Sequence, residues 1–207
     1  MPTVAVHGLA AQERQRVRSA SLDEIRQWVN GQTVLTFLGY SSAEYELHAN
    51  MMAKAVTVLA EHDPAKVLVN IGATCDGIGS VYRLAKQLGF KTMGIVSTQA
   101  VASGARWSPA VDQVFLINDW TWGGTDGSGA LHPTSAAMVA LSDELVAIGG
   151  GTIARDELLA GRRLGKPCRF IPAESNHKLA RAKALKAKQP EPTNFTSALG
   201  TTAWAFP

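Results

Sequence analysis

The chain has 207 residues, of which 46% are hydrophobic and 18% are charged, and its formal net charge is +3. A chain of this length buries enough apolar surface to fold without disulfides or a structural metal. No apolar run approaches the roughly 20 residues of a membrane span, and the N-terminus lacks the apolar core of a signal peptide. We therefore expect a cytoplasmic protein with no membrane partner. So small a net charge does not by itself indicate binding to nucleic acid.

The sequence divides into three predicted parts. Residues 1–20 show no clear hydrophobic period and are expected to form an N-terminal arm. Residues 21–188 alternate apolar runs with helical patterns and form one folded domain. Residues 189–207 form a proline-rich tail that ends in aromatic side chains, and we expect this tail to dock on its own domain or on a second subunit.

The first elements carry clear start signals. Ser21 and Glu24 have the spacing of a capping box and open a short helix that Gly31 ends. The first strong strand runs from Thr33 to Gly39, and Ser41 or Ser42 is expected to cap a helix over about 43–61. The face of this helix that is predicted to pack on the sheet consists of Leu47, Met51, Met52, Ala55, Val58 and Leu59.

The same alternation continues to the end of the domain. Further strands are predicted at 66–72, 91–97, 113–118, 144–148 and 168–172, and helices at 80–88, 99–107, 134–142, 152–164 and 176–188. Strands this apolar need cover on both faces, which predicts an α/β fold with a doubly wound, Rossmann-like parallel sheet and helices on both faces. Ligands of such sheets bind at the carboxyl ends of the strands. The last helix is basic, and a solvated face is its default interpretation.

The turn after the strand 144–148 is the most informative feature of the chain. Glycines at 149–151 are followed by Thr152 and a helical pattern, so a strand ends in glycines and turns directly into a helix. Such a turn leaves backbone N–H groups free, and the helix dipole adds positive charge beside them. The turn therefore predicts a site for a phosphate or carboxylate, with a merely tight connection as the alternative.

Glycines and polar side chains also follow the first two strands. Asp76, in the second of these loops, could bind ribose hydroxyls or cap the helix after it. The residues predicted to bind a phosphorylated ligand are Gly39, Ser41, Ser42, Gly72, Asp76, Gly77, Gly79, Gly149, Gly150, Gly151 and Thr152.

Two segments resemble a known family. The segment 67–96, with its glycine loop, is similar to the second glycine-rich segment of the LOG family, the "lysine decarboxylase-like" nucleotide phosphoribohydrolases. Leu131-His132 and the turn 149–152 resemble the approach to that family's PGGxGTxxE motif. The resemblance covers roughly residues 33–173. It implies a Rossmann-like fold that binds a nucleotide or sugar phosphate and assembles as a homodimer or larger homo-oligomer. Related groups include nucleoside deoxyribosyltransferases and proposed molybdenum cofactor carriers.

The chain departs from the family at the catalytic positions. Where the family has an Arg-Lys pair, this chain has Thr134-Ser135, and the family's glutamate position holds Arg155. Glu157 or Asp156 could take over the glutamate's role, because a carboxylate near the anomeric carbon stabilises the positive charge that builds up when an N-glycosidic bond breaks. The alternative is a pair of surface acids that the helix dipole favours.

Three further side chains are possible site residues. Asp119 and Trp120 end the strand 113–118, where an indole (Trp120 or Trp122) could stack on a base or simply pack on the core. His132 could act as an acid or base or have a structural role. The sequence predicts no metal site, because no His or Cys cluster has ligand spacing. It predicts no resident cofactor either, and the first strand lacks the dinucleotide fingerprint.

Two functions remain open from the sequence. The first is an enzyme that cleaves or transfers at a glycosidic carbon with Glu157 or Asp156 as the working carboxylate. The second is a nucleotide sensor or pterin cofactor carrier that keeps the phosphate turns without the catalytic pair. Cys75 and Cys168 suit a reducing compartment, and a bridge between them also stays open.

Overall fold

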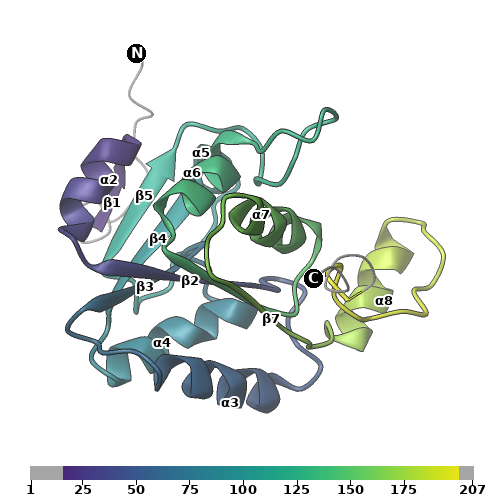
Figure 1. Ribbon diagram of the computed structural model, residues 1–207. Helices are drawn as coiled ribbons and strands as arrows, with labels where there is room; N and C mark the ends of the chain where they lie inside the picture. Colours follow the sequence, from purple (N-terminus) through teal and green to yellow (C-terminus); the bar gives the residue numbers. More distant parts are fainter. Residues whose placement is uncertain (1–15, 201–207) are drawn as a thin grey trace.

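Seven parallel strands form the central sheet of the computed structural model, which describes residues 16–200. Their spatial order is β1-β5-β4-β3-β2-β6-β7, so the predicted doubly wound, Rossmann-like α/β fold is confirmed (Figure 1). The strands are β1 Val17–Ser19, β2 Thr33–Gly39, β3 Val67–Ile71, β4 Lys91–Ser97, β5 Gln113–Ile117, β6 Glu144–Ile148 and β7 Cys168–Ile171.

Helices cover both faces of the sheet because side chains of each central strand point alternately to the two faces. In β2, Leu35 and Phe37 belong to one apolar core, while Val34 and Leu38 belong to the other. On the upper face in Figure 1 lie α2 Leu22–Val29, α6 Pro133–Leu141 and α7 Thr152–Arg163; on the lower face lie α3 His48–Leu59 and α4 Val81–Gln87. The remaining helices are the 3-10 turn η1 Gly77–Ser80, the short α5 Thr98–Ala102 and α8 His177–Lys186.

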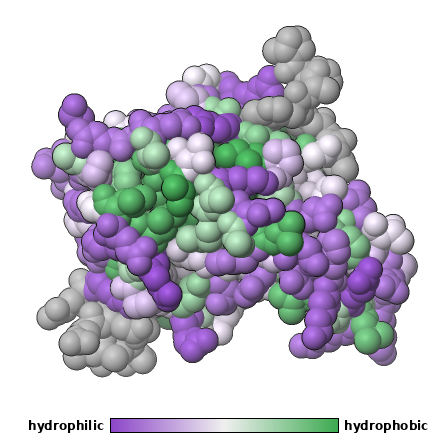
Figure 2. All heavy atoms as spheres, turned by 90° about the horizontal axis from the view of Figure 1, so that it is seen from below, coloured by the Kyte–Doolittle hydropathy of each residue, from purple (hydrophilic) through white to green (hydrophobic). Residues whose placement is uncertain are grey.

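The lower face is shown from below in Figure 2. Polar side chains dominate its rim, and apolar ones gather in a patch over α3 and α4. Val56 and Leu88 are among the large apolar side chains that these helices and their ends leave exposed.

The chain changes direction at the centre of the sheet. It runs from β2 outward through β3, β4 and β5, and then returns to place β6 on the other side of β2. The segment after β2 leads to α3 below the sheet, whereas the turn after β6 leads to α7 above it. The carboxyl ends of β2 and β6 therefore form the topological switch point, which is where ligands of such sheets bind.

The predicted capping box of α2 is present, and most predicted elements lie within a few residues of their observed bounds. Within the predicted arm 1–20, residues 17–19 form β1, which pairs with β5, and residues 1–15 lie outside the described part. Of the predicted tail, residues 189–200 are described and 201–207 are not.

Cys75 and Cys168 are free thiols. Among the described residues, no helix is long and apolar enough to cross a membrane.

The helix predicted over about 43–61 was wrong at its start. It begins at His48, with Leu47 as its N-cap residue, and neither Ser41 nor Ser42 caps it. The reason is Tyr45, whose hydroxyl donates to the carbonyl of Ile148 (2.7 Å) and accepts from the N–H of Tyr40 (3.1 Å). This buried anchor holds the segment 41–47 in a series of turns, in which Tyr45 forms an isolated bridge with Ser175.

We expect Tyr45→Phe to lower the free energy of unfolding by about 1–3 kcal/mol, because it leaves the buried carbonyl of Ile148 and the N–H of Tyr40 without a partner. Urea unfolding measures this change. Tyr40→Phe is the matched control, since the Tyr40 hydroxyl forms no aligned hydrogen bond with a described residue and its removal should be close to neutral. Equal losses in both variants would contradict the role given to Tyr45.

Candidate functional site

The turn that joins β6 to α7 has the backbone geometry that the sequence predicts. Gly149 and Gly150 have positive φ angles of 60° and 111°, which favour glycine, and Gly151 is the N-cap residue of α7 in an extended conformation. No side chain caps this helix, and its first turn carries no acidic residue. The N–H groups of the first turn have no partner within the helix itself, so they are available to an anion.

The three glycines of this turn have different surroundings. A Cβ atom added to Gly150 would lie 2.6 Å from the Cβ of Ala154 and 3.4 Å from the Cα of Gly39. A Cβ on Gly149 would lie 2.7 Å from the ring of Tyr40. These two glycines therefore permit close packing. Gly151 is exposed, and nothing lies within 4 Å of the position its Cβ would take, so open space adjoins the helix terminus there.

The glycine loop after β3, residues 73–79, packs against the loop that follows β2. The N–H of Ile78 donates to the carbonyl of Tyr40 (2.7 Å), and a Cβ on Gly77 would collide with that same carbonyl. Gly79 similarly approaches the carbonyl of Thr74. Asp76 is exposed and its side chain makes no cap hydrogen bond with η1, so the capping interpretation is not supported.

Exposed polar groups lie around this edge of the sheet. Ser41 and Ser42, directly after β2, are exposed, and so is Thr152 at the start of α7. The ammonium group of Lys183 donates to the hydroxyl of Ser42 (3.2 Å), which brings the basic helix α8 to the loop after β2. Gly72, at the end of β3, has no atom within 4 Å of its Cβ position.

Glu157 is buried between α6 and α7, where its carboxyl is held by a short chain of hydrogen bonds. The hydroxyl of Ser135 donates to Glu157 Oε1 (2.6 Å) and accepts from the N–H of Gly124 (2.7 Å). Burial raises the pKa of Glu157 to about 7, against the hydrogen bond from Ser135, and the nearby charge of Asp156 adds to the rise. The carboxyl is therefore mostly protonated below pH 7 and ionises as the pH rises above it.

Asp156 faces different partners. Its Oδ2 accepts from the hydroxyl of Thr125 (2.9 Å), and its Oδ1 accepts from the guanidinium of Arg155 (2.8 and 2.9 Å). Gly124 packs over the same place, because a Cβ on it would lie 3.7 Å from Asp156 Oδ2 and 3.3 Å from the side chain of Ile153. The two predicted catalytic carboxylates are thus adjacent in α7, and the loop around Gly124 bonds to Asp156 directly through Thr125 and to Glu157 only by way of Ser135.

The loop between β5 and α6 is anchored by Asp119. Its carboxylate accepts from the N–H of Thr134 (2.9 Å) and from the N–H and hydroxyl of Thr121 (2.8 Å each). Burial acts to raise the pKa of Asp119, but these hydrogen bonds outweigh it and the pKa lies below its ordinary value. Asp119 therefore holds the start of α6. Trp120 and Trp122 are exposed.

His132 is the N-cap residue of α6, where its backbone N–H donates to the carbonyl of Gly124 (2.9 Å), and its side chain makes no cap hydrogen bond. This contact helps to place the glycine pair 123–124 above the two carboxylates.

The structure brings together residues that the sequence did not connect. Ser135, noted in the sequence only as a replacement for a basic residue, is the partner of Glu157. Tyr40 is buried beside the glycine turn, close to the Gly150 backbone and Ser175, yet its hydroxyl has no aligned partner among the described residues. Residues 194–200 also lie at the turn, because the N–H of Ala198 donates to the carbonyl of Gly150 (3.0 Å). No local sequence signal marks the last two contacts.

Comparison with known proteins finds similarity of fold. No protein-family profile matches the chain, and no curated protein is a significant match. The chain is similar to the Northeast Structural Genomics Consortium target TM1055, with 22% identity and a TM-score of 0.47 over 66% of this chain and 72% of that one. It is also similar to two structures of the molybdenum cofactor carrier protein from Chlamydomonas reinhardtii. For these the identities are 18% and 19%, with TM-scores of 0.48 and 0.49, over 68% and 67% of this chain and 76% of each of those.

The buried carboxyl of Glu157 should make stability depend on pH. Its pKa rises from 4.5 to about 7 on folding, so the folded chain holds this proton more tightly than the unfolded chain. The resulting stabilisation is complete below pH 4.5 and is lost as the pH rises through 7. We expect Glu157→Gln, which cannot ionise, to gain up to about 3 kcal/mol relative to the wild type between pH 4.5 and 8, at about 1.4 kcal/mol per pKa unit.

Urea unfolding of both proteins at several pH values measures this difference. Glu191→Gln, at an exposed glutamate near the C-terminus, is the control and should run parallel to the wild type. A Glu157→Gln curve that also runs parallel would mean that the carboxyl does not hold its proton in the folded chain.

Proposed function

We propose that the protein binds a phosphorylated ligand, a nucleotide or a sugar phosphate, with its phosphate on the N–H groups of the first turn of α7. The observation that carries this proposal is the open space at Gly151, beside an uncapped terminus of a 12-residue helix at the switch point of the sheet. A helix terminus of this kind attracts anions through its free N–H groups and its dipole.

The surroundings of the turn suit the rest of such a ligand. The hydroxyls of Thr152 and Ser42 are exposed at the same edge, and Lys183 reaches Ser42 from α8. The side chain of Asp76 is exposed and free of a cap hydrogen bond, as a carboxylate that binds ribose hydroxyls must be. These groups support a ligand that combines an anion with a polyhydroxylated part.

Binding without turnover agrees better with the positions of the two carboxylates than catalysis does. Glu157 is 5% exposed and accepts a hydrogen bond from the hydroxyl of Ser135, while Asp156 is paired with Arg155 and Thr125. Glu157 also lies six residues beyond Gly151, about 9 Å along the helix axis at 1.5 Å per residue. Neither carboxylate reaches an open surface above the turn, so we infer a sensor or a carrier, with a pterin cofactor among the candidate cargoes.

A second candidate function is hydrolysis of an N-glycosidic bond. The observation that favours it is the raised pKa of Glu157, because a carboxyl with a pKa of about 7 can donate a proton to a departing base at neutral pH. This function requires the glycine pair 123–124 to move away from Ser135 and Ile153.

The expected cytoplasmic location and homo-oligomeric assembly remain predictions from the sequence.

Gly151→Asp should strongly weaken binding of the phosphorylated ligand while the fold is retained. Gly151 has an ordinary φ of −85° and open space around it, and aspartate is a favoured N-cap residue. The new carboxylate would occupy the free N–H groups and repel a phosphate. We expect at least tenfold weaker binding of AMP or ribose 5-phosphate by calorimetry, with an unchanged or slightly raised melting temperature.

Gly127→Asp is the matched control, because Gly127 also has open space around it and lies in the β5–α6 loop. It adds the same charge away from the helix terminus and should leave the affinity unchanged. Equal affinities for Gly151→Asp and the wild type would refute the phosphate site.

The two candidate functions differ in the fate of the ligand. If the protein is a sensor or carrier, chromatography after prolonged incubation with nucleoside monophosphates should recover each ligand intact. Free base that appears with the wild type and disappears with Glu157→Gln would instead establish the hydrolase, because that variant keeps the hydrogen-bond acceptor for Ser135 but has no proton to donate.

A further inference from the structure

The C-terminal segment 194–200, here called the C-terminal strap, lies against the glycine turn. The N–H of Ala198 donates to the carbonyl of Gly150 (3.0 Å), and the strap turns there through a hydrogen bond from the N–H of Gly200 to the carbonyl of Ser197 (3.0 Å). Figure 1 shows the yellow segment that follows α8 running back toward α7 and the end of β7. The strap therefore reaches the switch point from the far end of the chain.

The buried end of the strap inserts an apolar side chain into the upper core. Leu199 is 1% exposed and belongs to the same apolar cluster as Leu38, from the end of β2, and Ala154, from the first turn of α7. Ser197 is buried beside it. Together with the hydrogen bond from Ala198 to Gly150, this places the strap next to the open space at Gly151, at the edge of the sheet where ligands of this fold bind.

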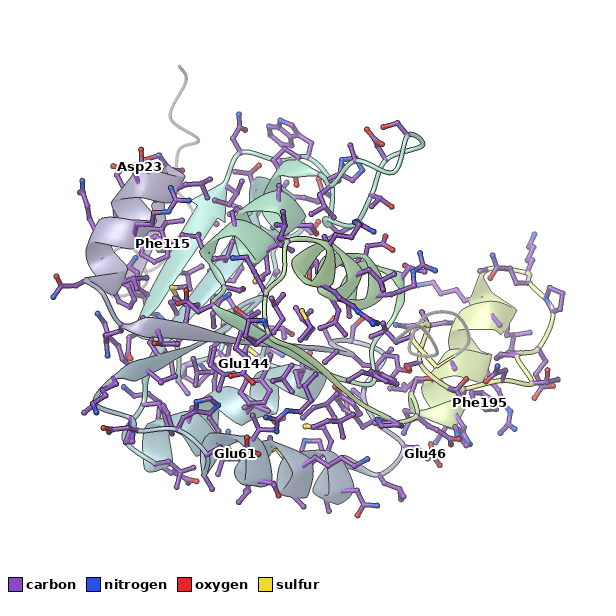
Figure 3. The ribbon with its side chains drawn as sticks, viewed as in Figure 1. Asp23, Glu46, Glu61, Phe115, Glu144 and Phe195 are labelled. Carbon is purple, nitrogen blue, oxygen red and sulfur yellow. The ribbon has the colours of Figure 1, made fainter. Side chains whose placement is uncertain are left out.

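The other end of the strap rests on α8 through Phe195. The carbonyl of Phe195 accepts from the N–H of Ser175 (3.0 Å), and its ring stacks on His177 with centroids 4.0 Å apart. The guanidinium of Arg181 lies 5.2 Å from the centre of the same ring. Figure 3 shows Phe195 at α8, away from the central sheet. This contact attaches the strap to α8 at a point separate from Leu199.

We propose that the C-terminal strap is an intramolecular competitor of the phosphorylated ligand, which must displace Ala198 and Leu199 from the switch point to bind fully. This inference rests on the proposed function. Leu199 and the hydrogen bond from Ala198 to Gly150 hold the inserted end at the turn, whereas Phe195 provides a separate anchor from which the strap can return. The buried Tyr40 hydroxyl beside Gly150 is left without an aligned partner in the closed arrangement, and a polar ligand could supply one.

Leu199→Ala in the full chain tests this competition, because it weakens insertion of the strap without touching the N–H groups of α7. We expect AMP to bind roughly tenfold more tightly than to the wild type, since the competent open state becomes more populated. Leu185→Ala is the matched control: Leu185 is 81% exposed on α8, and its loss should leave the affinity unchanged.

Hydrogen exchange of the wild type provides a second readout that does not depend on a variant. Saturating AMP should speed exchange of the Ala198 amide, whose bond to Gly150 the ligand would break. Unchanged or weaker AMP binding by Leu199→Ala, or an Ala198 amide that stays protected at saturation, would overturn the competition while leaving the phosphate site intact. Failure of both the wild type and Leu199→Ala to bind AMP or ribose 5-phosphate would refute the proposed function and the competition with it.

Discussion

The close approach of β2 to the β6–α7 turn is the constraint on which the rest of this structure depends. Gly39 and Gly150 allow two backbones to meet where any side chain would collide, and Tyr45 ties the same place together from below through the carbonyl of Ile148. Helix α7 consequently starts directly above the centre of the sheet. Gly149 and Gly150, which the sequence assigned to a ligand site, mainly permit close packing of the backbone. Gly151 is the glycine of this turn that has open space beside it.

The order of the sheet follows from apolar runs that can be recognised in the sequence, because strands buried on both faces leave little ambiguity. The start of α3 could not be predicted in this way, since Tyr45 is held by residues about a hundred positions away. The site shows the same division. The turn at Gly149 and Gly150 is a local signal, whereas the contact of Glu157 with Ser135 depends on the packing of two helices that the sequence does not place.

The replacement of a basic pair by Thr134 and Ser135 acquires a physical meaning in the structure. The hydroxyl of Ser135 donates to a glutamate that is enclosed between two helices, and the same hydroxyl accepts from the N–H of Gly124 and so holds the loop above it. A basic side chain at that position would keep Glu157 ionised, whereas a neutral hydroxyl lets it stay protonated. The residue at position 135 thus determines whether Glu157 belongs to a charged pair or to a neutral structural contact.

The pairing of β2 with β6 also shapes how the chain must fold. Leu35 lies opposite Glu144, so the centre of the sheet joins residues more than a hundred positions apart. Contacts at such separation form slowly, because closing the long loop costs conformational entropy before the contacts can stabilise the chain. During synthesis, β2 therefore emerges long before its neighbour and presents an apolar edge that can pair with other chains. Correct folding of the nascent chain therefore depends on protection of the β2 edge until the second half of the domain, which contains β6, has been synthesised.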